Sequence, residues 1–172
     1  MPASISPDRG FRAKLRYAFL LFCAIAACSS SVNTEEQSKA LAIMENGRAA
    51  VRQQRYTDAL VFFQRASVHN PSLAAVHFER GNIFAQLGQT VAAVEAYEQA
   101  LALQANHAES RHNLAVLRAD QGRLPDAIAL LENLRDYAPA LETLALFYTK
   151  QGQYQAAEQA LKHAISKTPN LG

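Results

Sequence analysis

The 172 residues contain five histidines, but their spacing does not form a metal site or a catalytic group. No pair has the His-Glu-x-x-His spacing of zinc hydrolases, and no cysteine lies beside them in the sequence. Glu95 and Glu98 are placed like two carboxylates on one solvent-facing side of a helix, whereas an acid–base pair needs a cleft. There is no serine in a nucleophile elbow and no glycine-rich phosphate loop. The five histidines are His69, His77, His107, His112 and His163. The sequence therefore predicts a protein that is not an enzyme and holds no metal or cofactor.

Cys28 is the residue whose surroundings predict a specific modification. Arg9, Arg12, Lys14 and Arg16 precede an eleven-residue apolar run at 17–27. This is the pattern of a secretory signal, and it is shorter than the about 20 apolar residues that a membrane-spanning helix needs. The run ends Ile25-Ala26-Ala27-Cys28, which resembles the lipobox of bacterial lipoproteins.

The resemblance implies a lipoprotein signal peptide at 1–27, cleaved before Cys28, and a diacylglycerol on the thiol of Cys28. Residues 28–39 would form the lipidated N-terminus and a tether, with 29–33 as its polar, flexible part. Thr34 with Gln37 forms a capping box at which the first helix can begin. In such lipoproteins an aspartate after the cysteine favours retention at the inner membrane, whereas here Ser29 follows. In a Gram-negative bacterium this implies an outer-membrane anchor and a protein that faces the periplasm. A plain signal peptidase site or an uncleaved anchor is the alternative.

The rest of the chain repeats with a period of 34 residues. Ala59, Ala93 and Ala127 are 34 residues apart, and a fourth copy at Ala157 follows after 30. Apolar residues around each alanine recur at helical spacing. Glycines at 88, 122 and 152 suit the ends of helices. A period near 34 predicts an all-α solenoid with repeats at 40–73, 74–107, 108–137 and 138–171.

Three stretches carry a resemblance to the tetratricopeptide repeat (TPR) family: YTDALVFFQRASVHNP (56–71), GQTVAAVEAYEQALAL (88–103) and GQYQAAEQALKHAISKTP (152–169). The resemblance covers about residues 40–170 and implies a right-handed superhelix of about four helix-turn-helix units. An ordinary helical bundle with alanine-rich helices is the alternative.

The third repeat departs from the family pattern in two ways. It is four residues short around positions 135–140, and Arg111 and Arg118 stand at two positions that are normally apolar. In one interpretation their aliphatic stems pack while the guanidinium groups reach Asp120, Glu132 or solvent. In the other they form a basic patch for a partner at the junction of the third and fourth repeats.

In TPR proteins the first helix of each unit lines a concave groove that binds protein segments. The resemblance places twelve residues there, with Met44 and Phe78 as apolar anchors and with Arg48, Asn82 and Gln86 as hydrogen-bonding groups. A clamp for a C-terminal carboxylate is not expected, because Glu79 and Glu109 occupy two of its positions. The twelve groove candidates are Met44, Arg48, Arg52, Phe78, Asn82, Gln86, His112, Val116, Asp120, Glu142, Leu146 and Lys150.

The charge of the chain argues against a nucleic-acid partner. The sequence has 17 basic and 15 acidic residues; without residues 1–27, which hold four basic residues and Asp8, 13 and 14 remain, a net charge of −1. The sequence thus predicts a lipid-anchored adaptor that binds a partner protein, with pilus or secretion-system assembly as the first candidate pathway. A regulatory subunit of a cell-wall enzyme and a self-associating structural lipoprotein are the alternatives. The polar side of residues 155–166 favours a monomer.

Overall fold

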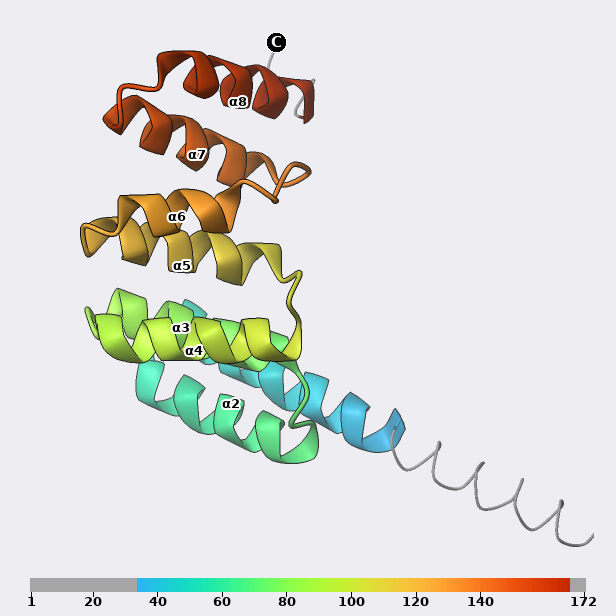
Figure 1. Cartoon of the computed structure of the whole chain (residues 1–172). Helices are drawn as coiled ribbons and strands as arrows, with labels where there is room; N and C mark the ends of the chain where they lie inside the picture. The colour runs from blue at the N-terminus through green and yellow to red at the C-terminus, as the bar shows by residue number, and fades with distance from the viewer. Residues whose placement is uncertain (1–33, 168–172) are drawn as a thin grey trace, which may run out of the picture.

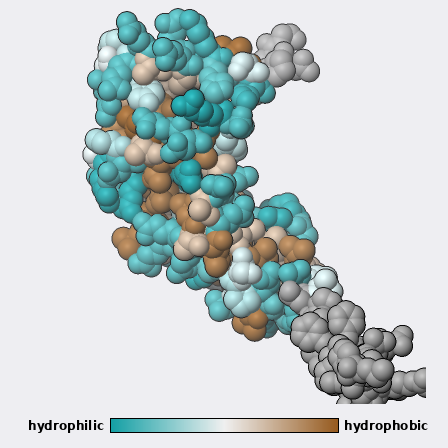
Figure 2. Space-filling view, turned by 45° about the vertical axis from the view of Figure 1, so that its right-hand side comes forward, coloured by the Kyte–Doolittle hydropathy of each residue, from teal (hydrophilic) through white to brown (hydrophobic). Residues whose placement is uncertain are grey.

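The structure is a computed structural model that describes residues 34–167. Within that range the chain forms helices joined by short turns, with no strand. The helices stack in chain order from α2 at one end to α8 at the other (Figure 1), and the stack is curved and hollowed on one side (Figure 2). The prediction of an all-α solenoid is confirmed. A first helix covers 34–52, followed by α2 (Tyr56–His69), α3 (Ala74–Gln86), α4 (Thr90–Leu103), α5 (Ala108–Asp120), α6 (Leu124–Leu131), α7 (Ala138–Lys150) and α8 (Tyr154–Lys167).

In the first two repeats a glycine on the first helix faces a large aromatic ring on the second. A Cβ atom added to Gly81 would lie 2.5 Å from Cε1 of Tyr97, and one added to Gly47 would lie 2.6 Å from Cε1 of Phe63. Both rings are almost completely buried. Glycine therefore allows the helix backbone to approach the ring closely, which packs the two helices without a void.

The turn inside each repeat uses a residue in the left-handed backbone region. Gly88, Gly122 and Gly152 have φ angles of 71°, 78° and 75° and end the first helices of repeats two to four. The first repeat has Gln54 at this position with φ of 58°. Glutamine adopts this conformation at a cost that glycine avoids, so the first turn is the strained one.

The shortening of the third repeat falls on its second helix. Helix α6 has 8 residues, whereas α2, α4 and α8 each have 14. The chain leaves α6 after Leu131 and turns before α7 begins at Ala138. The connection between α6 and α7 lies on the same side of the stack as those between α2 and α3 and between α4 and α5 (Figure 1). The space that the last six residues of a 14-residue helix would occupy is thus left on this side.

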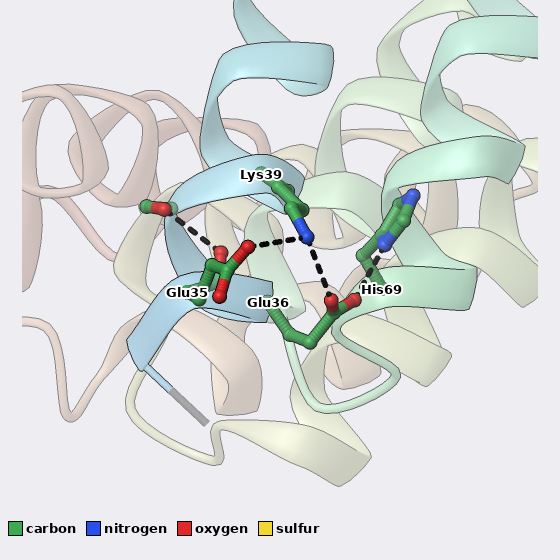
Figure 3. A network of polar contacts seen from close by, with 5 residues as sticks. Glu35, Glu36, Lys39 and His69 are labelled. Carbon is green, nitrogen blue, oxygen red and sulfur yellow. Dashed lines mark hydrogen bonds and ion pairs between the residues drawn. The ribbon is translucent and has the colours of Figure 1, made fainter. Parts of the chain in front are cut away.

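The beginning of the described chain differs from the predicted tether. Residues 34–39 are already helical, because charged side chains support the first turns. Lys39 lies 2.8 Å from a carboxylate oxygen of Glu35 and 3.2 Å from one of Glu36. Nδ1 of His69, at the end of α2, lies 2.7 Å from the other oxygen of Glu36 (Figure 3). The tether prediction is therefore wrong for 34–39, and the predicted signal peptide and Cys28 lie outside the described residues.

Candidate partner-binding face

The first helices of successive repeats share one face, formed by residues 34–52, α3, α5 and α7, which we call the first-helix face. Side-chain pairs join neighbouring helices across it, each between residues 31 positions apart. We call these pairs the ladder: Arg48 with Glu79, Asn82 with Asn113, and His112 with Thr143. Three of the predicted groove residues, Arg48, Asn82 and His112, thus hold the repeats in register.

Arg48 and Glu79 form the first rung. Nε of Arg48 donates a hydrogen bond of 2.6 Å to Oε1 of Glu79, and Glu45 lies 3.7 Å from the same guanidinium group. The Glu79 side chain is largely shielded from solvent, which strengthens the pair relative to an exposed one. The rung fixes α3 against the first helix and uses the charge of Arg48 within the fold.

The second rung includes a buried hydroxyl group. Tyr97 on α4 donates a hydrogen bond of 2.8 Å from its hydroxyl to Oδ1 of Asn82, and Nδ2 of Asn113 donates to the same oxygen at 2.9 Å. Burial raises the pKa of Tyr97, so its hydroxyl stays protonated as a donor. Asn82 thereby satisfies the buried polar group of the repeat core and links α3 to α5.

The third rung orients a histidine. The hydroxyl of Thr143 donates to the carbonyl of Pro139 at 2.9 Å, so its oxygen accepts from Nε2 of His112 at 2.8 Å. The ring of Tyr137 meets that of His112 edge-on, with centroids 5.8 Å apart. Burial lowers the pKa of His112, which favours the neutral ring at neutral pH.

The two predicted apolar anchors differ in how far they are buried. Met44 is only 5% exposed and belongs to the core formed with Ala59 and Phe63. Phe78 is half-buried, with its ring 6.1 Å from that of Tyr97 and 5.1 Å from that of His107. The prediction is therefore wrong for Met44, because the first helix turns this side chain toward the core. Phe78 contacts the neighbouring rings but keeps part of its surface accessible, so its role as an anchor stays a prediction.

The accessible part of the first-helix face lies elsewhere. Leu146 on α7 is 53% exposed, and Val116 on α5 is half-buried. Glu142 and Lys150 are exposed one turn before and one turn after Leu146, and Nζ of Lys150 lies 6.0 Å from the ring centroid of Phe147. The other exposed candidates of the groove are Arg52, which pairs with Glu45 at 3.1 Å, Gln86 and Asp120.

Two family profiles match the sequence, one for the TPR repeat at residues 81–122 and one for the tetratricopeptide repeat at 112–171. Together the matches cover more than half of the 172 residues. The chain belongs to the tetratricopeptide repeat family. No curated protein matches the sequence.

Solved structures of TPR proteins share the fold at low sequence identity. The crystal structure of MamA is 20% identical with a TM-score of 0.66, over 96% of this chain and 97% of that one. PilW, described as a widely conserved type IV pilus biogenesis factor, is 22% identical with a TM-score of 0.67, over 77% of this chain and 63% of its own. Pseudomonas aeruginosa PilF is 19% identical with a TM-score of 0.68, over 80% and 64%. This chain thus spans less than two thirds of the PilW and PilF structures.

The two arginines of the third TPR repeat have different contacts. Arg118 reaches Glu98 on α4 with an N–O distance of 2.5 Å. One interpretation expected Asp120, Glu132 or solvent around this guanidinium group, so the partner that it actually has was not among those predicted. A guanidinium nitrogen of Arg111 donates to the carbonyl of Ala105, before α5. Arg118 is thereby removed from the predicted basic patch, whereas Arg111 has no carboxylate partner among the described residues.

The described part of the TPR domain contains neither a metal-binding cluster nor a membrane-spanning helix. Among residues 34–167, no group of three histidine, cysteine, aspartate or glutamate side chains is arranged to hold a metal ion. No helix of the same part of the chain has the length and apolar character to cross a membrane. The charged groups of the first-helix face serve the ladder or face solvent.

Proposed function

We propose that this TPR protein is a non-enzymatic scaffold that holds a partner protein on the first-helix face, mainly through repeats three and four. The exposure of Leu146 on α7 carries the proposal, and Val116 on the preceding first helix, α5, is half-buried. These aliphatic side chains offer a contact for an apolar residue of a partner, and Glu142 and Lys150 offer charges of both signs next to it.

The ladder supports this function by keeping the binding face rigid. Its three side-chain pairs connect all four repeats. Without these pairs, the same side chains would have to become ordered when the partner protein docks. A preorganised surface loses less conformational entropy when a partner docks, which favours affinity. The polar groups of the ladder thus contribute to binding indirectly, by positioning α5 and α7.

We also propose that Cys28 carries the lipid that anchors the scaffold to the outer membrane, facing the periplasm. Its support is the sequence Ile25-Ala26-Ala27-Cys28 after a short apolar run. Confinement at the membrane raises the effective concentration of the scaffold for partners there. The structural likeness to PilW and PilF favours assembly of a pilus or a related secretion machine over regulation of a cell-wall enzyme.

Site-specific photocrosslinking tests the binding face. A photoreactive residue at Leu146 should capture a pilus or secretion component in intact cells. The matched control is Val91 on α4, which is 71% exposed but lies on a second helix. Equal capture at Leu146 and Val91, or capture at Val91 alone, would contradict the proposed face. Capture of a peptidoglycan hydrolase or synthase at Leu146 would instead support the regulatory alternative.

Metabolic labelling with an alkyne fatty acid tests the anchor. The wild-type protein should incorporate the label and sediment with outer membranes, whereas Cys28→Ser should lose both properties. Cys23→Ser is the matched control and should retain them, because Cys23 lies within the apolar run. Label that persists in Cys28→Ser would show that the lipid, if present, is attached elsewhere.

A further inference from the structure

The short α6 leaves a set of adjoining hollows at the junction of repeats three and four. One of about 470 Å³ lies against α7 and α8, with Leu141, Leu144 and Ala160 among its lining residues. A second of about 320 Å³ lies where α5 and α7 begin, and a third of about 330 Å³ extends toward α4. Asn133 lines all three, so they surround the segment that replaces the missing turns of α6. We call these hollows the α6 notch.

Two arginines of the α6 notch lack a carboxylate partner. Arg135 is exposed and makes no hydrogen bond or ion pair with the rest of residues 34–167, and it lines two of the hollows. Arg111 also lines two, and its described hydrogen bond goes to the carbonyl of Ala105, which leaves its charge uncompensated. The second hollow, at the start of α5 and α7, is lined by both arginines.

The acidic residues of the α6 notch are already engaged. Asp136 is paired with Lys167 of α8, and the pairing lowers the pKa of Asp136. Glu132 accepts a hydrogen bond of 3.0 Å from the hydroxyl of Tyr148. The second hollow, which Glu132 does not line, therefore holds two arginines beside an aspartate that is already paired, and it adjoins the aliphatic residues of the first hollow. This combination is complementary to a carboxylate beside an apolar side chain.

We propose that the α6 notch is a second docking site, separate from the first-helix face, for an acidic segment of a partner protein. Carboxylate groups of the segment bind Arg111 and Arg135, while an aliphatic side chain next to them enters the hollow floored by Leu141, Leu144 and Ala160. Guanidinium groups suit this role because they bind carboxylates with two parallel hydrogen bonds.

The shape and composition of the α6 notch favour a protein segment over a lipid surface. A flat anionic membrane is best met by a projecting cluster of basic residues, whereas here the arginines and the apolar residues line hollows. An extended peptide fits adjoining hollows because its alternate side chains can enter neighbouring ones. The same site on a regular repeat would be filled by the last turns of a 14-residue second helix.

Fluorescence anisotropy with the full-length protein in detergent tests the site. The probe is a fluorescein-labelled eight-residue peptide of alternating glutamate and leucine, and its control has glutamine in place of glutamate. We expect the acidic peptide to bind at least about tenfold more tightly than the control peptide. Arg135→Gln with Arg111→Gln should remove this preference, and added salt should weaken it.

Matched variants separate the α6 notch from general effects. Arg65→Gln on α2 removes an arginine of the same charge far along the chain and should leave binding unchanged. Arg135→Glu alone should weaken binding as well. Because it keeps the hydrogen bond from Arg111 to Ala105, this single variant provides the test if the double variant unfolds. Leu146→Glu should also leave peptide binding unchanged, because it alters only the first-helix face.

Three results would overturn the proposal. The first is equal affinity for the acidic and control peptides. The second is acidic binding that the Arg135 variants do not reduce, while circular dichroism shows them folded. The third is binding to phosphatidylglycerol vesicles, lost in Arg135→Glu, without any binding of the acidic peptide, which would assign the arginines to a membrane. Failure of photocrosslinking at Leu146 would leave these outcomes untouched, so the two docking sites are tested separately.

Discussion

Gly81 should accept alanine only when the ring of Tyr97 is removed as well. A Cβ atom at position 81 would lie 2.5 Å from Cε1 and 2.6 Å from Cδ1 of that ring. Non-bonded carbons prefer a separation of about 3.5–4.0 Å, so one of the two helices must shift. The ring cannot move freely, because its hydroxyl donates to Asn82 at 2.8 Å and the side chain is 1% exposed.

Two opposing effects set the size of the change. Alanine within a helix is favoured over glycine by about 0.5–1 kcal/mol, whereas overpacking a core costs about 1–3 kcal/mol. We expect Gly81→Ala to lower the free energy of unfolding by about 1–2 kcal/mol. With Tyr97→Leu already present the clash is gone, and the same substitution should be neutral or stabilising by up to about 1 kcal/mol. The third repeat has this combination, since Ala115 and Leu131 occupy the two positions and are both fully buried.

A double-mutant cycle measures this coupling. Urea unfolding of the wild type, Gly81→Ala, Tyr97→Leu and the double variant, followed by far-ultraviolet circular dichroism, should give a coupling energy of about 2 kcal/mol. The cycle of Gly47→Ala with Phe63→Leu repeats the test, because a Cβ at Gly47 would lie 2.6 Å from the Phe63 ring. If Gly81→Ala costs the same in both backgrounds, the ring does not exclude a side chain at this position and the explanation of the pairing is wrong.

Three further predictions concern the first turn, the pH response and the start of the chain. Gln54→Gly should raise the free energy of unfolding by about 0.5–1 kcal/mol because it relieves a φ of 58°, and urea titration should show the reverse change for Gly88→Gln. Burial lowers the pKa of His77 and His112 below 6.5, so the unfolded chain binds protons first as the pH falls. The urea concentration at the unfolding midpoint should therefore decrease when the pH is lowered from about 7 to about 5. The decrease should be smaller in His112→Gln. Glu36→Gln should speed amide hydrogen exchange in residues 34–39 by weakening the contact with His69, whereas Glu35→Gln should preserve that contact.

The repeat architecture could be predicted from the sequence because it depends on local spacing. Alanines every 34 residues mark the close approach of two helices, and Ala59, Ala93 and Ala127 are all fully buried. The glycine turns follow from the need for a positive φ, which the chain supplies at positions 88, 122 and 152. Both signals are contained within one repeat, so no knowledge of the neighbouring repeat is needed.

The binding face was harder to predict because it depends on how neighbouring repeats are offset. Position 44 was expected in the groove, but the first helix presents Met44 to the core that contains Phe63. Arg118 finds its carboxylate on α4, in the preceding repeat, and not at Asp120 or Glu132. Contacts between residues 31 positions apart, such as Arg48 with Glu79, have no local pattern that identifies them.

The ladder and the shortened α6 together explain why we place both proposed docking sites in repeats three and four. In the first two repeats, Arg48, Glu79 and Asn82 are joined to one another or to Tyr97 and Asn113, so a partner would have to break existing contacts to use them. Beyond the last rung, Leu146 and Lys150 are exposed. On the second helices, the loss of residues after Leu131 exposes Arg135 without a carboxylate partner in 34–167. A binding segment gains most where it displaces only water, and this condition is met at α7 and at the α6 notch.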